Sequence, residues 1–409
     1  MSQLIAAVSP GSRAARRLIR PLVATLAASG LLLAGACSGG EEPAPGAPES
    51  SAGAEHGDTR TITDILGREV TVPATVEHAA LGSQRMLYTT AVLNPDEPLD
   101  GIAAWPDDMK RNDPEAYNKY REKFPEIEDI ATIGKIEDID PEELLGLEPD
   151  VFVVSADKFD SAEEAGLVGT LEKAGVATVA IDFFLDPVNH TVPSIELMGE
   201  LFGQEDNAER FVDFYEAKKS AVADRLKEEK PEPVDTFLWR AAGNGDCCGT
   251  FSDSNLSQIV NFVGGHNIGD DLLPDINAGE VSPEAVVDAN PEVLLLTGAN
   301  WGPANSEFKE GSYVPLGYDE PADKAKEDLK SAIDNQPGIK ELDAVKEGRA
   351  FAAWHHFYNS PYNFLAMEWF AKAIHPELFA DLDPQADFEE LHEEFLPIEA
   401  EGTFWTGLS

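Results

Sequence analysis

Hydrophobic and polar residues follow two alternating patterns along this chain from about residue 62 onwards. Short apolar runs are separated by stretches in which apolar residues recur every three or four positions. The first pattern predicts strands and the second predicts helices, and their alternation is typical of an α/β fold. The predicted strands cover residues 78–81, 101–104, 151–154, 177–181, 236–239, 293–296 and 350–353.

Residues 193–230 contain no strand pattern and predict a long helical connector, which we place at residues 191–230. Its first part is apolar and ends at Gly203. In its second part, apolar side chains have the spacing of one helix face. They are Ala208, Phe211, Val212, Tyr215, Val222 and Leu226.

The segments on either side of the connector repeat one helix-then-strand unit. Residues 140–154 and 282–296 align without a gap, so that Glu142 in the first corresponds to Glu284 in the second. The alternative is coincidence in a chain rich in proline and glutamate. The repeat predicts an α/β protein with two similar lobes, at residues 60–190 and 231–409, joined by the connector helix and enclosing a ligand cleft.

Polar and aromatic residues follow several predicted strands, at the edge where an open α/β sheet binds its ligands. We expect seven of them to face a ligand: Arg85, Tyr88, Trp239, Arg240, Trp301, His356 and Tyr358. A guanidinium can hold carboxylate or catecholate oxygens in a fork, although Arg85 and Arg240 could instead pair with nearby acids. The aromatic residues could form a wall for a flat ligand, or some could belong to the core.

The eight histidines are scattered, except that His355 and His356 are adjacent. Neighbouring residues on a strand point to opposite sides, so at most one of the two is expected to face a ligand. The alternative is a polar residue at the rim. The chain contains no nucleophile elbow, phosphate loop or His-Glu-x-x-His motif, and we expect no catalytic residues, no cofactor and no bound metal.

Cys247 and Cys248 are adjacent, with Gly245 and Gly249 close by. Neighbouring Cα atoms are about 3.8 Å apart across a trans peptide, so a bond between the two side chains would close a strained ring. Oxidising conditions outside the membrane favour such a vicinal disulfide, and two buried thiols are the alternative.

The first 36 residues have the pattern of an export signal. Arginines precede an apolar run of 16 residues, which is short for a membrane span. The run ends in Leu33-Ala34-Gly35-Ala36-Cys37, which resembles the lipobox of bacterial lipoproteins, with Ala34 where leucine is commoner. Export by the general or the twin-arginine route stays open. Residues 37–59 predict a disordered tether, so we expect a lipid anchor on Cys37 at the extracytoplasmic face of the membrane.

The acidic net charge of the chain argues against nucleic acid and anionic membrane surfaces as partners. The chain of 409 residues has 30 basic and 76 acidic residues, for a net charge of −46. Nucleic acid and anionic membrane surfaces would repel it, so neither is expected as a partner, and we expect a monomer held to the membrane only through its lipid.

Several further motifs, considered together, resemble those of the substrate-binding lipoproteins of ABC importers for iron–siderophores and vitamin B12. The motifs lie at residues 64–70, 148–151, 262–267, 282–284, 344–351 and 375–377, and the resemblance extends from the lipobox to Phe395. It implies a ferric siderophore or similar metal chelate as the ligand and a permease with its ATPase as partners. A corrinoid, haem, an oxyanion or a bare metal ion are alternatives in the same fold. A lipid-anchored hydrolase using His355 or His356 with a serine is an alternative of another class.

In that family, one glutamate of each lobe docks into arginine pockets of the permease. The matching positions here are Glu142 and Glu284. Acidic residues at these places also favour the helix dipole, because Asp140 and Ser282 are expected to cap the two helices. Docking and capping are compatible roles.

Overall fold

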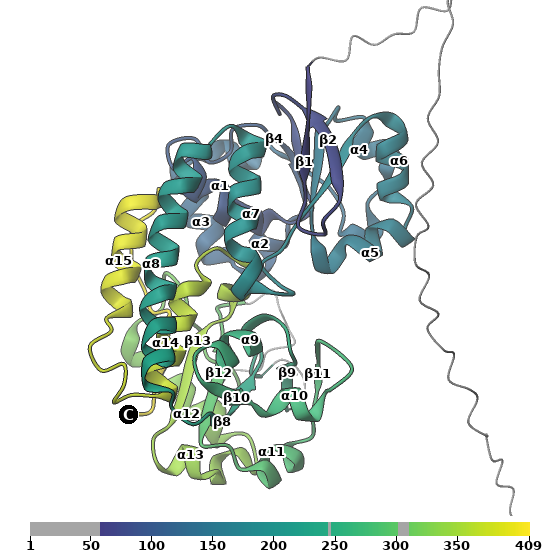
Figure 1. Ribbon diagram of the computed structural model, residues 1–409. Coiled ribbons are helices and arrows are strands. Elements are labelled where there is room, and N and C mark those ends of the chain that lie inside the picture. Colours follow the sequence, from purple (N-terminus) through teal and green to yellow (C-terminus); the bar gives the residue numbers. More distant parts are fainter. Residues whose placement is uncertain (1–57, 244–246, 302–310) are drawn as a thin grey trace, which may run out of the picture. The chain divides into compact units, whose positions relative to one another are not determined.

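The computed structural model describes residues 58–243, 247–301 and 311–409. These residues form two five-stranded sheets, each with its own helices (Figure 1). The expected export signal and Cys37 lie outside the described residues. The expected tether ends slightly earlier than predicted, because Thr59 is already part of strand β1 (Thr59–Thr63), which pairs with β2 (Glu69–Pro73).

The first sheet is parallel throughout and has the strand order β5-β4-β3-β6-β7. Its strands are β3 (Ala79–Leu81), β4 (Ile102–Trp105), β5 (Ala131–Thr132), β6 (Val151–Ser155) and β7 (Ala177–Ile181). Its helices are α1 (Leu87–Leu93), α2 (Asp108–Asn112), α3 (Pro114–Lys123), α4 (Pro141–Leu145), α5 (Ala156–Glu164) and α6 (Leu167–Ala174). Four of the five strands were predicted, whereas the two-residue β5 was not.

Strand β6 shows how both faces of this sheet are covered. Val151 and Val153 join one buried apolar cluster, and Phe152 and Val154 join another. Successive side chains of a strand point to opposite faces, so a strand buried on both faces is continuously apolar. Helices are therefore required on both sides of the sheet.

The second sheet has the order β10-β8-β12-β13-β14 and is parallel except for its last strand. Its strands are β8 (Val234–Trp239), β10 (Gly265–Asn267), β12 (Val293–Gly298), β13 (Ala350–Trp354) and β14 (Trp405–Gly407). Its helices are α9 (Asn255–Phe262), α10 (Ile268–Leu272), α11 (Pro283–Ala289), α12 (Ala322–Asp334), α13 (Asp343–Lys346), α14 (Asn363–Ile374) and α15 (Pro384–Phe395). The three predicted strands are confirmed as β8, β12 and β13, and the two edge strands were missed.

The connector consists of two helices, α7 (Pro187–Phe202) and α8 (Glu205–Glu229). They are separated at Gly203, which has a φ of 63° and therefore the left-handed conformation that glycine adopts without strain. The predicted break is at this residue. Helix α7 begins at Pro187, earlier than the predicted start at residue 191, and includes Pro193 in its interior.

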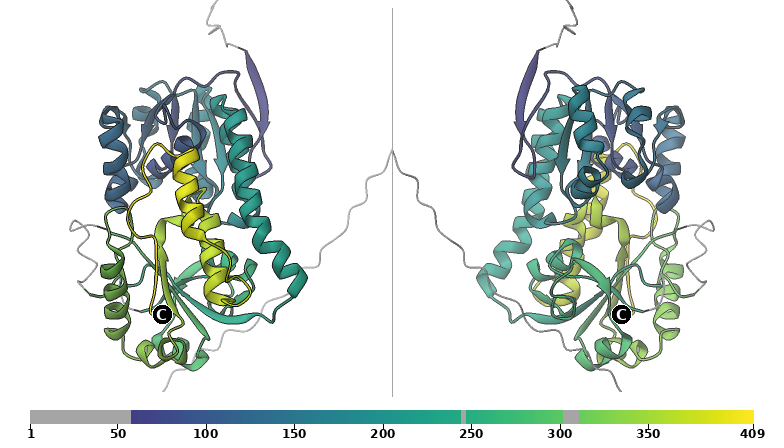
Figure 2. Two further views of the ribbon diagram at one scale, coloured as in Figure 1. Left: turned by 90° about the vertical axis from the view of Figure 1, so that its left-hand side faces the viewer. Right: turned by 90° about the vertical axis from the view of Figure 1, so that its right-hand side faces the viewer.

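The last helix connects the lobes a second time. Helix α15 belongs to the C-terminal part of the chain but contacts α1 of the first lobe (Figure 2). Beyond it, Glu401 forms an ion pair with Lys119 of α3. The chain therefore bridges the lobes both through the connector and through its C-terminal segment.

Candidate functional site

A pocket of about 620 Å³ lies between the two lobes. It opens where strands of both sheets end, since Gly82 follows β3, Pro106 follows β4 and Arg240 follows β8. This is the edge at which open α/β sheets bind ligands. Besides these three residues, the lining comprises Ser83, Arg85, Asp108, Arg111, Asn112, Lys135, Ile136, Glu137, Ser155, Asp157, Lys158, Phe184, Tyr358 and Asn359.

The pocket has the opposite charge balance to the chain as a whole. Five basic residues line it, namely Arg85, Arg111, Lys135, Lys158 and Arg240. Three acidic residues line it, namely Asp108, Glu137 and Asp157. In a chain with 30 basic and 76 acidic residues, this excess provides local positive charge. Such a pocket attracts an anion even though the whole protein repels one.

Arg85 is already engaged by protein partners. Its Nε lies 3.0 Å from Asp108 Oδ2, and its guanidinium also donates to the hydroxyl of Tyr358 and lies 4.9 Å from the centre of that ring. Burial opposes its charge, but Tyr358 and Asp108 outweigh burial and raise the pKa of Arg85. Arg85 therefore stays charged and links the two lobes, because Tyr358 belongs to the second lobe.

Arg240 differs from Arg85 in having unused donors. Its buried Nε has no hydrogen-bond partner, and no carboxylate of the described residues forms an ion pair with it. Its guanidinium lies 5.4 Å from the centre of the Phe251 ring, and burial lowers its pKa. Buried donors are normally satisfied, so this guanidinium is available for an acceptor on a ligand.

Two aromatic residues line the pocket, Tyr358 and Phe184. Their rings meet edge to face with centres 5.9 Å apart. The other aromatic residues expected at the site lie in the core: Tyr88 is 0% exposed, Trp239 is 3% exposed and Trp301 is 5% exposed. The structure therefore brings Arg85, Arg240 and Tyr358 together at the pocket and places Tyr88, Trp239 and Trp301 behind it.

His355 and His356 do not follow the expected geometry. They begin a short 3-10 helix after β13 rather than ending the strand, and both are buried. His355 Nδ1 lies 2.8 Å from Thr297 Oγ1, and His356 Nε2 donates to the carbonyl oxygen of Asn112 at 3.0 Å. Burial lowers the pKa of His356 to about 3, so this ring is neutral. His356 thus joins the lobes behind the pocket instead of facing it.

Sequence reasoning missed Lys135, Lys158, Arg111 and Phe184. Lys135 comes shortly after β5, which is too short to be recognised from its apolar pattern. Phe184 lies three residues beyond Ile181, the end of the predicted strand β7, and could have been found, since strand ends were the guide elsewhere.

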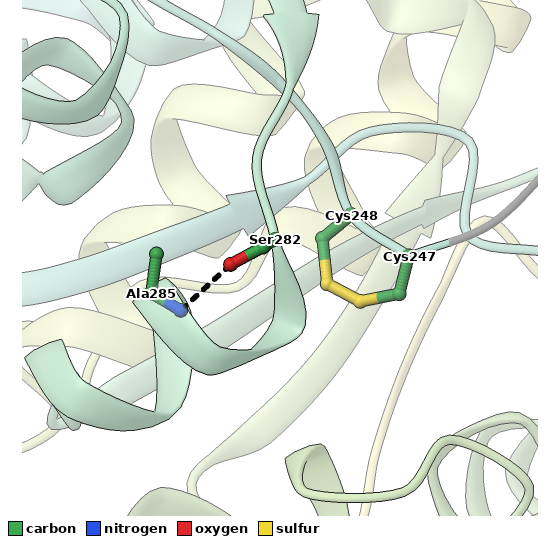
Figure 3. Close-up of a disulfide and its surroundings, with 4 residues drawn as sticks. All are labelled: Cys247, Cys248, Ser282 and Ala285. Atoms are coloured by element: carbon green, nitrogen blue, oxygen red, sulfur yellow. Dashed lines mark hydrogen bonds between the residues drawn. A yellow bond between two sulfur atoms is a disulfide. The ribbon is translucent and has the colours of Figure 1, made fainter. Parts of the chain in front are cut away.

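Cys247 and Cys248 are joined by a vicinal disulfide, and the peptide bond between them is cis (Figure 3). Both residues are buried, and Cys248 exchanges two main-chain hydrogen bonds of 2.9 Å with Val281. The pair therefore lies beside Val281, the residue that precedes Ser282, and Ser282 caps helix α11.

Glu142 and Glu284 occupy equivalent places at the starts of α4 and α11, and both are exposed. Asp140 accepts a hydrogen bond from the main-chain nitrogen of Glu142 at 2.9 Å. Ser282 Oγ accepts one from the main-chain nitrogen of Ala285 at 3.2 Å. The two caps leave both glutamate side chains directed to the surface.

Two negative findings concern only the residues that the structure describes. Within residues 58–243, 247–301 and 311–409, no group of three or more His, Cys, Asp or Glu side chains is arranged to hold a metal ion. In the same ranges, no helix has the length and apolar character needed to cross a membrane.

Comparison with known proteins supports a common ancestry with transport proteins. Residues 100–353 match the family described as Periplasmic binding protein. The molybdate-binding protein MolA of Haemophilus influenzae is 23% identical over 364 residues, which cover 82% of this chain and 90% of MolA.

Solved structures share the fold. The TroA-like periplasmic binding protein FepB from Veillonella parvula has a TM-score of 0.76 and 25% identity, over 85% of this chain and 99% of that one. MolA of Haemophilus influenzae bound to molybdate has a TM-score of 0.61 and 21% identity, over 84% of this chain and 99% of that one. CeuE of Helicobacter pylori with Ni(II) bound has a TM-score of 0.58 and 16% identity, over 83% of this chain and 97% of that one.

Proposed function

This chain belongs to the periplasmic binding protein family, and on that premise we propose that it captures an anionic ferric siderophore for an ABC importer. Members of the family are extracytoplasmic solute-binding proteins rather than enzymes, and they deliver their ligand to a permease. The identity of the ligand is the part that we infer from the pocket.

The charge of the pocket is the observation that carries this proposal. Five basic residues and three acidic residues surround a space of about 620 Å³ in a chain with a net charge of −46. Pockets of roughly 300–1,000 Å³ suit ligands of the size of small drugs, and a siderophore complex is in this range. Phe184 and Tyr358 add aromatic surface for the rings or chains of such a ligand.

An oxyanion is the second candidate, because the relative MolA is a molybdate-binding protein. Arg240 with its unused Nε could bind such an anion. The size of the pocket favours the larger ligand. A volume of about 620 Å³ lies within the range of roughly 300–1,000 Å³ that suits drug-sized ligands, whereas a four-oxygen anion fills only a small part of it.

A fluorescence titration tests the proposal. Trp239 directly precedes Arg240, so a bound ferric chelate is expected to quench emission. We expect saturable quenching by a ferric tris-catecholate complex, which is anionic, and none by the iron-free ligand. Saturable binding of molybdate, haem or a corrinoid, with no binding of anionic ferric chelates, would contradict the proposal.

Three further expectations belong to the same proposal. A lipid on Cys37 would hold the protein at the membrane through the tether that precedes β1. Glu142 and Glu284 would dock on the permease, one from each lobe. The division of the chain at residues 190 and 230 into lobe, connector and lobe stays a prediction, as does the monomeric state.

A further inference from the structure

Strands β9 (Gly249–Phe251) and β11 (Ala278–Glu280) form a two-stranded antiparallel ribbon that contacts two features of the second lobe. At one side of the ribbon, the main-chain nitrogen of Arg240 donates to the carbonyl oxygen of Gly249 at 2.8 Å. At the other side, the strand β11 leads through Val281 into Ser282, the cap of helix α11. The ribbon therefore contacts both the pocket arginine and the helix that carries Glu284.

The side chain of Arg240 also rests on this ribbon. A Cβ atom built on Gly249 would lie 3.6 Å from a terminal nitrogen of Arg240, and the guanidinium carbon lies 5.4 Å from the centre of the Phe251 ring. Burial lowers the pKa of Arg240, whereas Tyr358 and, to a smaller extent, Glu280 of β11 favour its charged form. A shift of the ribbon would therefore move the guanidinium relative to the pocket.

The vicinal disulfide closes the end of the ribbon nearest to α11. Cys248 donates to Val281 and accepts from it, at 2.9 Å in both cases, so the ladder continues one step beyond β9. Cys248 is 0% exposed and Cys247 is 9% exposed. Figure 3 shows the disulfide beside the turn that presents Ser282 to Ala285. The bond links the two cysteine side chains into a small ring, which removes their free rotation next to this turn.

We propose that the Cys247–Cys248 disulfide is a positioning element that couples the ligand pocket to helix α11. The proposal rests on the proposed function, in which Arg240 contacts the ligand and Glu284 contacts the permease. In this proposal, a ligand that binds the guanidinium of Arg240 displaces Gly249. The ribbon, held at this end by the disulfide, transmits the displacement through Val281 to the start of α11. Coupling of this kind is reciprocal, so that a partner bound at α11 changes the affinity for the ligand.

A cycle of variants tests the coupling without any ligand. The full chain carries Cys37→Ala, so that only the vicinal pair can react, and Arg240→Gln is combined with Cys247→Ser/Cys248→Ser. Hydrogen exchange is measured at the amides of residues 285–289. With the disulfide intact, Arg240→Gln is expected to change these exchange rates about threefold to tenfold, the usual size of such couplings. Without the disulfide, the same substitution is expected to change nothing there.

A second experiment removes the disulfide without substitutions, so that its result does not depend on correct folding of the serine variants. A small dithiol reduces the disulfide of the unsubstituted pair to two thiols, and the dithiol itself is oxidised to a disulfide. Reduction is expected to remove the response of α11 as the serine substitutions do. Arg111→Gln is the control, because Arg111 lines the pocket but does not contact the ribbon, and it is expected to leave α11 unchanged. An equal response of α11 to Arg240→Gln with and without the bond overturns the proposal.

The last arm uses ferric tris-catecholate as the probe. Loss of the disulfide is expected to weaken binding of the probe about threefold to tenfold and to abolish its effect on exchange at α11. Unchanged affinity together with an unchanged effect at α11 also overturns the coupling. If the unsubstituted protein does not bind the probe, the siderophore proposal is wrong, and the ligand-free cycle still decides the coupling.

Discussion

Glu115 of the first lobe accepts a hydrogen bond from Asn300 of the second lobe, with 2.6 Å between Oε1 and Nδ2. The same amide nitrogen donates to Glu320 at 3.0 Å, and the main-chain nitrogen of Asp319 donates to the other oxygen of Glu115 at 3.2 Å. Burial is the main cause that raises the pKa of Glu115 to about 7, and the nearby carboxylates Glu320 and Asp113 act in the same direction. A carboxyl group that ionises near neutral pH therefore lies in the contact between the lobes.

This contact predicts a pH dependence of stability. The folded protein holds the proton of Glu115 more tightly than the unfolded chain, in which the pKa is 4.5. The stabilisation is complete below pH 4.5 and is lost as the pH rises through about 7. After allowance for solvent screening, we expect a loss of about 1–2 kcal/mol. Glu115→Gln should remove this part of the pH dependence, measured as the free energy of unfolding in urea between pH 5 and 8.

The matched control is Glu122→Gln, an exposed position on the same helix, α3. It removes one carboxylate from the same part of the chain without touching the second lobe. Identical pH profiles for Glu115→Gln and the unsubstituted protein would show that the Glu115 carboxyl does not titrate in this contact.

Arg240→Ala is expected to weaken binding of an anionic ferric complex. Its guanidinium has an unused donor at the pocket, and a hydrogen bond to a charged group contributes about 1.5–3 kcal/mol. That range corresponds to an increase in Kd of about ten- to a hundredfold. The melting temperature of the empty protein should barely change, because no ion pair with a described residue is lost. Fluorescence titration and thermal unfolding measure the two effects.

Arg85→Ala provides the comparison, since Arg85 is held by Asp108 and Tyr358. It should lower the melting temperature as well as the affinity, because it removes the ion-pair partner of the Asp108 carboxylate and a link between the lobes. If both arginine variants keep the affinity of the true ligand, that ligand is neutral or is held by Phe184 and Tyr358, and the anionic siderophore is the wrong ligand.

Reversing both Glu142 and Glu284 to arginine is expected to abolish uptake by cells while the affinity for the ligand in solution stays the same. Both side chains are exposed and lie at equivalent helix starts, one in each lobe. Uptake of radioactive iron and titration of the purified variant separate the two effects.

The caps of the same helices serve as controls for that experiment. Asp140→Ala or Ser282→Ala should cost about 1 kcal/mol of stability, the usual value for a lost N-cap, and should preserve uptake. Normal uptake by the double glutamate variant would remove the docking role. A fall in stability without a loss of uptake would assign both glutamates to the helix dipole alone.

Cys37→Ala is expected to release the protein from the membrane fraction into the medium. The reason is that the apolar run of the export signal would be cleaved and no lipid would be attached. Fractionation of cells followed by immunoblotting measures the distribution. Complete retention of the processed variant in membranes would contradict anchoring by lipid.

The regular elements could be predicted because their signals are local. A strand buried on both faces must be apolar at successive positions, as in residues 151–154, and a helix start shows its cap, as Asp140 does before Pro141. The five-residue strands β1 and β2, which pair with each other, were missed as well. The missed strands β5, β10 and β14 are only two or three residues long. Their pairing depends on hydrogen bonds to neighbours far away in the sequence, which leave little trace in composition.

The sequence by itself determined the two-lobe α/β plan, the break of the connector at Gly203 and the edge of the sheets at which a ligand would bind. It could not say which strand-end side chains reach that edge. Arg240 and Tyr358 line the pocket, whereas Trp239 and His356 turn into the core, although all four follow or end strands of the same sheet. Only the tertiary structure decided this, because the direction of a side chain beyond a strand depends on what the opposite lobe places against it.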